Sequence, residues 1–227
     1  MFDLTLRPLK DKVFEPLCGL APSAVTPLQL TLAAFISGLL SCYAAVVANP
    51  PLAFAFWVLN RCLDCMDGAV ARRRGQASDL GGFLDLLGDF IVYSAIPICC
   101  TLGLPPTIDQ AELQRRWVSV AVVESTFHVN NFVLFFIAAL TEKQRAAAIQ
   151  MADDKGTKHK VKELTTLSMK PALIEGAESG LIFSIMLAFP NMTELLCWLL
   201  AGGVAFGTMQ RTGWLVAALG RHERTAS

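Results

Sequence analysis

Six apolar stretches, each about as long as a bilayer-crossing helix, occupy most of this chain of 227 residues. They cover residues 28–48, 52–72, 80–102, 117–140, 172–189 and 195–219. A spanning helix takes about 20 mostly apolar residues. The chain is 54% hydrophobic and only 17% charged, whereas soluble domains carry roughly 25% charged residues. We therefore expect an all-α fold, namely a polytopic membrane protein with six transmembrane helices.

The two ends of the chain differ from this apolar middle. Residues 1–26 mix charged side chains with apolar residues at helical spacing, namely Leu6, Leu9, Val13 and Leu17. This pattern favours a short interfacial amphipathic helix on the membrane surface, and a frayed polar tail is the alternative. We expect a juxtamembrane amphipathic segment at 1–26, a six-helix transmembrane domain at 27–220 and a polar tail at 221–227.

Basic residues indicate how the chain crosses the membrane. Fifteen of the 19 Lys and Arg lie in the N-terminal arm, at residues 72–74, in the segment 141–170 or in the C-terminal tail. Basic loops stay on the cytoplasmic side, so we expect an integral multi-pass protein with both termini in the cytoplasm. The zero net charge argues against nucleic-acid binding. The odd count of seven Cys argues against a disulfide-stapled secreted module.

Acidic residues occur where a membrane protein tolerates them least. Seven lie within or at the ends of the predicted spans: Asp64, Asp67, Asp85, Asp89, Glu124, Glu175 and Glu178. Only Arg61 and Arg211 lie there with the opposite charge. A charged side chain at a helix centre costs roughly 2.5–3.5 kcal/mol on insertion scales. Two divalent cations would supply most of the missing positive charge, and intramembrane acids of this kind indicate a functional site.

The spacing of four of these acids favours one shared pocket. Asp64 and Asp67 share one face of a helix with Gly68 and Ala71, and Asp85 and Asp89 share one face of the next helix with Gly81. A turn of about eight residues joins the two helices, which predicts antiparallel neighbours. Carboxylate oxygens suit a hard ion, Mg²⁺ or Mn²⁺, rather than zinc. Arg61, three residues before Asp64, is interpreted as a structural partner of that carboxylate.

The same residues resemble a known family signature. They fit the pattern D-x2-D-G-x2-A-R-x8-G-x3-D-x3-D at all eight named positions, from Asp64 to Asp89. This is the signature of the CDP-alcohol phosphatidyltransferases, and the six-span layout also resembles that family. So does Val25-Thr26-Pro27 before the first span, although the family often has Asn at the next position, where this chain has Leu28.

The resemblance implies a reaction, a location and partners. The family moves a substituted phosphate group from a CDP-alcohol, here expected to be CDP-diacylglycerol, to a hydroxyl acceptor and releases CMP. It implies phospholipid synthesis with two Mg²⁺ or Mn²⁺ ions in an active site that faces the cytoplasm. The expected partners are the CDP-alcohol donor, a small polar or phosphorylated alcohol as acceptor, membrane lipids and a second copy of the chain in a homodimer.

The resemblance also implies roles for individual residues. Asp64, Asp67 and Asp85 would ligate the metal ions, and Asp89 would ligate one ion and act as general base on the acceptor hydroxyl. The implied contacts to the CDP-alcohol come from the residues Gly68, Ala71, Arg72, Ser78 and Gly81. Gly68 permits close approach of the nucleotide, and Arg72 offers a fork of donors to the phosphates.

The acceptor site is less specified by the sequence. Arg211 could bind an acceptor phosphate or could pair with a glutamate and hold helices together. Glu175 and Glu178 could instead neutralise an ammonium acceptor such as choline, ethanolamine or serine. The polar residues between Glu124 and Asn131 favour interhelical hydrogen bonds over substrate contact.

Two other functions compete with this interpretation. A CDP-choline or CDP-ethanolamine type of aminoalcohol phosphotransferase shares the signature. A transporter would also place carboxylates inside the membrane, but transporters often have two related halves. The second half of this chain contains no copy of the Asp motif.

Overall fold

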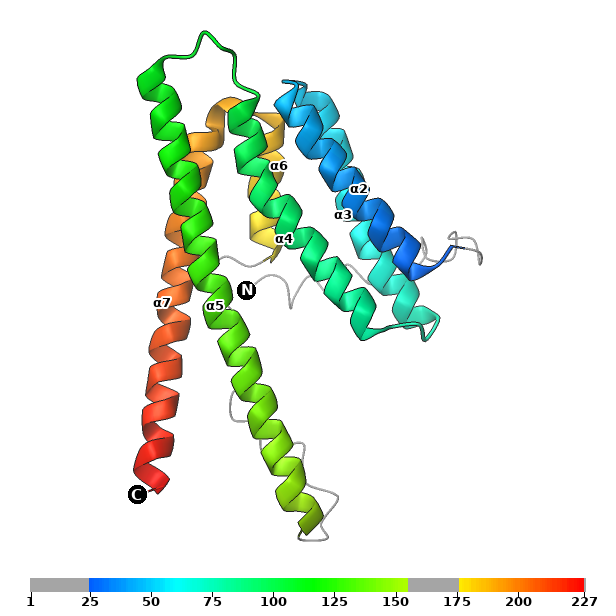
Figure 1. Cartoon of the computed structure of the whole chain (residues 1–227), viewed down its shortest axis with the longest axis vertical. Helices are drawn as coiled ribbons and strands as arrows, with labels where there is room; N and C mark the ends of the chain where they lie inside the picture. The colour runs from blue at the N-terminus through cyan, green and yellow to red at the C-terminus, as the bar shows by residue number, and fades with distance from the viewer. Residues whose placement is uncertain (1–24, 155–175, 227) are drawn as a thin grey trace. The chain divides into compact units, whose positions relative to one another are not determined.

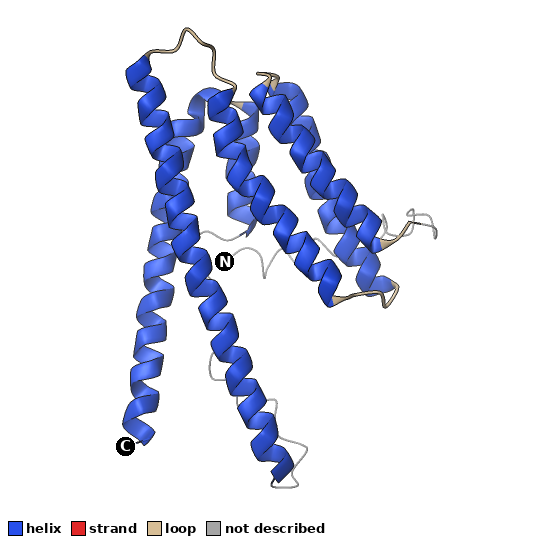
Figure 2. Cartoon of the chain, viewed as in Figure 1, coloured by secondary structure: helices blue, strands red, loops and turns tan. Residues whose placement is uncertain are grey.

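The computed structural model describes residues 25–154 and 176–226, and its regular elements there are helical (Figures 1 and 2). The helices are α2 (Pro27–Val46), α3 (Pro50–Arg73), α4 (Asp79–Leu102), α5 (Gln110–Asp154), α6 (Gly176–Ala188) and α7 (Thr193–Ala226), with a 3₁₀ turn η2 (Pro190–Met192). The predicted all-α class is confirmed for this part of the chain. The predicted amphipathic helix lies, except for its last two residues, outside the described residues, as does Glu175.

Local chemistry explains where the first three helices begin. Thr26 and Gln29 form a capping box at the start of α2, and Pro27 occupies its first turn. The Asn49 side chain accepts the amide of Leu52 at the start of α3, just before two prolines. Ser78 caps α4 by accepting the amide of Gly81. The three helices therefore begin within two residues of the predicted starts.

Four of the six predicted spans are long and apolar enough to cross a membrane, among the described residues. They are Pro27–Val46, Asp79–Leu102, Gln110–Ala146 and Pro190–Gly220. Helix α3 has 24 residues, but the polar side chains of its second half lower its mean hydropathy. Helix α6 has 13 described residues, fewer than the roughly 20 that a span requires. The protein is a membrane protein, and the count of six spans is not established by these helices.

Two helices extend well beyond the predicted spans. Helix α5 has 45 residues and α7 has 34, whereas the apolar windows were expected at 117–140 and 195–219. Residues such as Gln, Glu, Ala, Arg and Lys flank these windows and have high helix propensity. The helices therefore continue past the apolar residues instead of ending where hydropathy falls.

The chain divides into two compact units. The first contains α2, α3, α4, α6, η2, the start of α5 as far as Glu124 and the start of α7 as far as Leu200. The second contains the remainders of α5 and α7, where Val133, Ile137 and Leu215 form a small apolar cluster. In the first unit α2 packs along both α3 and α4, and α6 packs against the same two helices (Figure 1).

Helix α2 has the polarity pattern of a helix in lipid. Apart from Leu30, the residues on its buried face are small: Thr31, Ala34, Ser37, Gly38, Ser41, Cys42, Ala44 and Ala45. Its exposed face carries large apolar residues: Leu28, Leu32, Ile36, Leu39 and Tyr43. Small residues let membrane helices approach closely. At Gly38 a Cβ atom would lie 2.6 Å from a methyl group of Val92 on α4, so the close packing of α2 on α4 requires glycine there.

Candidate functional site

The connection between α3 and α4 forms one wall of the candidate site. Residues 74–78 join the two helices, and Gly75 adopts a positive φ of 64° that favours glycine. The guanidinium of Arg74 donates to the backbone carbonyl of Val25, which ties this connection to the start of α2. The end of α3 and the starts of α2 and α4 therefore meet in one place.

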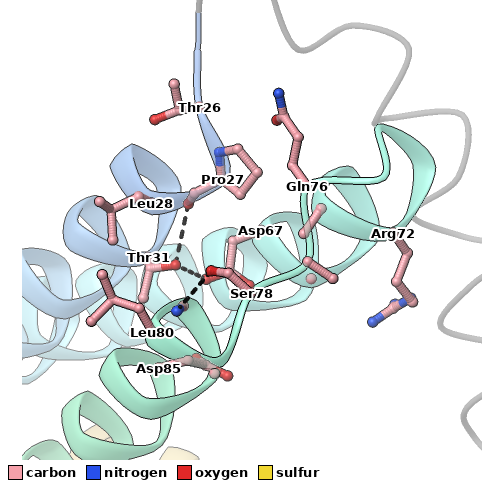
Figure 3. Close-up of a pocket in the computed structure, with 15 residues that line it drawn as sticks. Thr26, Pro27, Leu28, Thr31, Asp67, Arg72, Gln76, Ser78, Leu80 and Asp85 are labelled. Carbon is pink, nitrogen blue, oxygen red and sulfur yellow. Dashed lines mark hydrogen bonds between the residues drawn. The ribbon is translucent and has the colours of Figure 1, made fainter.

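A cavity of about 420 Å³ opens where these three helix ends meet (Figure 3). Its lining includes seven of the nine residues that the sequence assigned to the metal ions or the CDP-alcohol: Asp67, Gly68, Ala71, Arg72, Ser78, Gly81 and Asp85. Arg72 lies beside Gly68, since a Cβ atom there would be 3.1 Å from an Arg72 nitrogen. Figure 3 shows the Arg72 side chain pointing away from Asp67 and Asp85. The expected contact residues thus border one hollow, and their roles remain predictions.

Asp67 is the buried acid of the cavity, with 5% of its surface exposed. Its carboxylate accepts a hydrogen bond from the Thr31 hydroxyl of α2, and Figure 3 shows the two side chains facing each other. A hydrogen bond to a charged group contributes about 1.5–3 kcal/mol. This contact fixes one Asp67 oxygen and joins α2 to α3 at the cavity.

Asp64 and Asp89 do not line the cavity and instead contact Arg61 in the first unit. Nη2 of Arg61 lies 2.5 Å from Oδ1 of Asp89, and Nη1 lies 3.3 Å from Oδ2. The same Nη1 lies 3.5 Å from Asp64. Arg61 was expected to pair with Asp64, but its closer partner is Asp89 on the neighbouring helix. The reason is geometric, because the two-pronged guanidinium matches both oxygens of one carboxylate across the helix pair.

Several neighbours orient Arg61. Its Nε donates to Oδ1 of Asn60 at 2.7 Å, and Asn60 in turn donates to the backbone carbonyl of Ala34 on α2. Nη1 donates to the Tyr93 hydroxyl at 2.7 Å. The guanidinium carbon lies 4.8 Å from the Trp57 ring centre and 5.2 Å from that of Tyr93, within cation–π range. Arg61 is therefore held by aromatic and polar groups as well as by acids.

The four Asp residues fit a divalent ion in chemistry but do not form a metal cage in this arrangement. Carboxylate oxygens suit Mg²⁺ or Mn²⁺. However, among the residues that the structure describes, no three His, Cys, Asp or Glu side chains converge as metal ligands. Thr31 contacts Asp67 and Arg61 contacts Asp89, so those oxygens are already in use.

A second, apolar recess of about 310 Å³ lies between α2 and α4. It shares Leu28 and Thr31 with the cavity, and its other lining residues are apolar side chains and one glycine: Leu32, Phe35, Leu84, Leu87, Gly88 and Ile91. The cavity and the apolar recess therefore adjoin at Leu28 and Thr31.

Comparison with known proteins identifies the family. The family described as CDP-alcohol phosphatidyltransferase matches residues 22–205. The chain belongs to this family. The resemblance seen in the signature residues is thereby confirmed, and the protein is a membrane-embedded transferase of the phosphatidyltransferase class.

Relatives of several kinds share the sequence. The inner membrane protein YnjF of Escherichia coli (strain K12) is 31% identical over 207 residues, which cover 88% of this chain and 91% of that protein. The archaetidylinositol phosphate synthase of Pyrococcus horikoshii is 36% identical over 102 residues, covering 43% of this chain and 54% of that enzyme. The CDP-diacylglycerol–serine O-phosphatidyltransferase of Bacillus subtilis is 32% identical over 71 residues, which cover 31% of this chain and 40% of that enzyme.

A solved phosphatidyltransferase has the same fold. The crystal structure of Mycobacterium tuberculosis phosphatidylinositol phosphate synthase with CDP-DAG bound matches with a TM-score of 0.53. The match covers 91% of this chain and 92% of that chain at 18% sequence identity. At this identity the likeness concerns the fold.

The residues considered for the acceptor of this phosphatidyltransferase lie in different units. Arg211 belongs to the second unit, where its Nη1 donates to Oδ1 of Asn130 on α5 at 2.9 Å. Thr208 donates to the same oxygen at 3.1 Å. Glu178 lies half-buried on α6 in the first unit, and Glu175 is outside the described residues. The acceptor assignments therefore remain predictions.

Sequence reasoning missed four residues that shape the site: Thr31, Trp57, Asn60 and Tyr93. Two of them could have been found, because Trp57 precedes Arg61 by four residues and Tyr93 follows Asp89 by four, the spacing of neighbours on one helix face. Thr31 carried no such signal, since its partner Asp67 belongs to another helix.

Proposed function

We propose that this protein transfers a substituted phosphate group from a lipid CDP-alcohol of the CDP-diacylglycerol type to a hydroxyl acceptor and releases CMP. The observation that carries this proposal is the cavity at the α3–α4 connection. The five residues that the family signature and its neighbourhood assign to the CDP-alcohol all border it, together with Asp67 and Asp85.

The shape of the cavity supports a donor with a hydrophobic chain. Its polar part lies beside the first turn of α4, where backbone amides and the helix dipole favour phosphate groups. The adjoining apolar recess between α2 and α4 offers space to a hydrocarbon chain. A CDP-choline or CDP-ethanolamine donor has no chain to place there, so this continuity favours the lipid-linked donor.

Each signature residue has a chemical task in this proposal. Asp64, Asp67, Asp85 and Asp89 would hold two divalent ions, which supply positive charge to a pyrophosphate and to the departing CMP. Asp89 would take the proton from the acceptor hydroxyl. Gly68 leaves room for the nucleotide, and Arg72 would donate to phosphate oxygens from the same end of the cavity.

The orientation in the membrane belongs to the same proposal. Arg72, Arg73 and Arg74 end α3 beside the cavity, and basic residues of this kind remain on the cytoplasmic side. We therefore infer a cavity that opens towards the cytoplasm, cytoplasmic termini and six spans in which α3 and α6 cross with the four more apolar helices. The homodimer implied by the family resemblance is testable by native mass spectrometry in detergent.

A CMP-release assay tests the proposal. Purified full-length protein in detergent is given CDP-diacylglycerol with Mg²⁺ or Mn²⁺ and a panel of acceptors that includes sugar phosphates, glycerol phosphate, serine, ethanolamine and choline. We expect CMP release that stops with EDTA and resumes when the divalent ion is restored. The acceptor in the panel that supports CMP release identifies the acceptor substrate.

Two results would contradict parts of this proposal. CMP release from CDP-choline but from no CDP-linked lipid would assign the protein to the aminoalcohol type. Absence of CMP release with every donor and acceptor would exclude the transfer reaction, and ion flux in proteoliposomes would then test the transporter alternative.

A further inference from the structure

We propose that Arg61 is a positioning residue that acts as a tethered cation in the carboxylate site, and that a divalent ion binds there only by displacing Arg61 from Asp89. This inference rests on the proposed use of divalent ions. The acids would strengthen the binding of divalent ions. Arg61 would weaken that binding and stabilise the protein without bound ions.

The contacts of Arg61 show the competition directly. Both oxygens of Asp89 face the guanidinium, at 2.5 and 3.3 Å, and Asp64 lies 3.5 Å from the same group. The side chains of Arg61 and Asp89 are only 24% and 27% exposed, so solvent screens this interaction less than at an open surface. An ion that binds Asp64 and Asp89 must therefore take oxygens that Arg61 now contacts.

The surroundings of Arg61 give it a place to remain after it releases Asp89. Its Nε stays bonded to Asn60, Nη1 stays near the Tyr93 hydroxyl, and the Trp57 ring covers the guanidinium. The Trp57 ring is itself fixed, because its indole nitrogen donates to Ser184 of α6 at 2.8 Å. A small rotation within this aromatic setting would separate Arg61 from Asp89 without exposing a bare cation to lipid.

The charge of Arg61 also offsets the repulsion between the acids that it contacts. Carboxylates near one another repel, and the Arg61 guanidinium lies against two of the four, Asp64 and Asp89. Arg61 therefore occupies oxygens of Asp64 and Asp89 that a divalent ion at these acids would use.

Metal affinity measured without turnover tests the inference. Full-length protein in detergent is stripped with EDTA and titrated with Mn²⁺, and free Mn²⁺ is followed by electron paramagnetic resonance. Loss of one charge-assisted contact changes binding by about tenfold, so Arg61→Gln is expected to bind Mn²⁺ about tenfold more tightly than the wild type. Arg61→Lys keeps the charge without the fork and is expected to shift affinity less, in the same direction.

A matched control and a second readout separate this role from a merely structural one. Arg115→Gln removes an arginine that contacts Glu194 at 3.8 Å and is 61% exposed, and it is expected to leave Mn²⁺ affinity unchanged. In thermal unfolding, added Mn²⁺ is expected to raise the Tm of Arg61→Gln more than that of the wild type, because the ion then supplies the missing positive charge.

The outcomes distinguish this inference from the proposed function. Unchanged or weaker Mn²⁺ binding by Arg61→Gln, with a wild type that binds Mn²⁺, overturns the role of Arg61 and leaves the transferase proposal intact. If Arg61→Gln does not fold, the direction of the Arg61→Lys shift decides in the same way. Absence of Mn²⁺ binding in the wild type overturns both proposals.

Discussion

Arg61 on α3 places its two terminal nitrogens against the two carboxylate oxygens of Asp89 on α4. The two residues are 28 positions apart in the sequence, and their contact links the helices that carry the signature acids. An edge-to-face contact between Trp57 and Tyr93, with ring centres 5.9 Å apart, lies beside it. These two contacts therefore help to fix the distance between α3 and α4 next to the signature acids.

Replacement of Asp89 by Asn is expected to remove most activity. Asn cannot accept the acceptor's proton as a carboxylate does, and general-base catalysis contributes about 10²- to 10⁴-fold. We expect the rate of CMP release to fall by about 10²-fold or more in a steady-state assay. Asp79→Asn, at the exposed start of the same helix, is the control and should retain activity. Near-wild-type turnover by Asp89→Asn would exclude Asp89 as the base.

Replacement of Thr31 by Val tests the contact with Asp67. Val has nearly the same shape but leaves one oxygen of a buried carboxylate without its hydrogen-bond donor. The free energy of unfolding is expected to fall by about 1–3 kcal/mol, measured by denaturant unfolding in detergent without divalent ions. Thr31→Ser keeps the hydroxyl and should remain close to the wild type. Equal stability of the Val and Ser variants would show that this hydrogen bond contributes little.

Replacement of Gly68 by Val is expected to obstruct the donor. A Cβ atom at this position would already lie 3.1 Å from Arg72, and overpacking costs about 1–3 kcal/mol. The KM for the CDP-alcohol should rise about tenfold or more, read from initial rates at saturating acceptor. Gly202→Val on α7, where nothing lies within 4 Å of the added Cβ, is the matched control. An unchanged KM would remove Gly68 from the donor site.

Replacement of Leu32 by Trp tests whether the apolar recess receives a hydrocarbon chain. Leu32 lines the recess, so a larger side chain would fill it. We expect kcat/KM to fall for a long-chain CDP-diacylglycerol and to change little for a short-chain analogue. Leu39→Trp is the control, because Leu39 is exposed on the same helix and does not line the recess. Equal losses for the two donors would argue against a chain in this recess.

Helix positions near proline and capping residues were predictable from the sequence. The first three helices begin within two residues of their predicted starts, because Thr26, Asn49 and Ser78 cap them. The end of α5 was not predictable in this way. The predicted span ended at residue 140, but α5 continues as a helix to Asp154, since hydropathy reports where a chain lies in lipid and not where its backbone hydrogen bonds stop.

The composition of the candidate site was predictable, but the pairing inside it was not. Periodicity places Asp64, Asp67, Asp85 and Asp89 on two helix faces. It contains no information on how far one helix slides along its neighbour. That register decides that Arg61 meets Asp89 and that Asp67 meets Thr31, and it depends on packing details such as the contact of Gly38 with Val92.

All residues that line the cavity lie between Thr26 and Asp85. Contacts that are local in the sequence close short loops and lose little chain entropy. This pocket can therefore assemble during membrane insertion as soon as the third long helix is in place, before the C-terminal half of the chain is synthesised. If the pocket holds the nucleotide as proposed, substitutions in that later half can alter the choice of acceptor without changing the residues of the pocket.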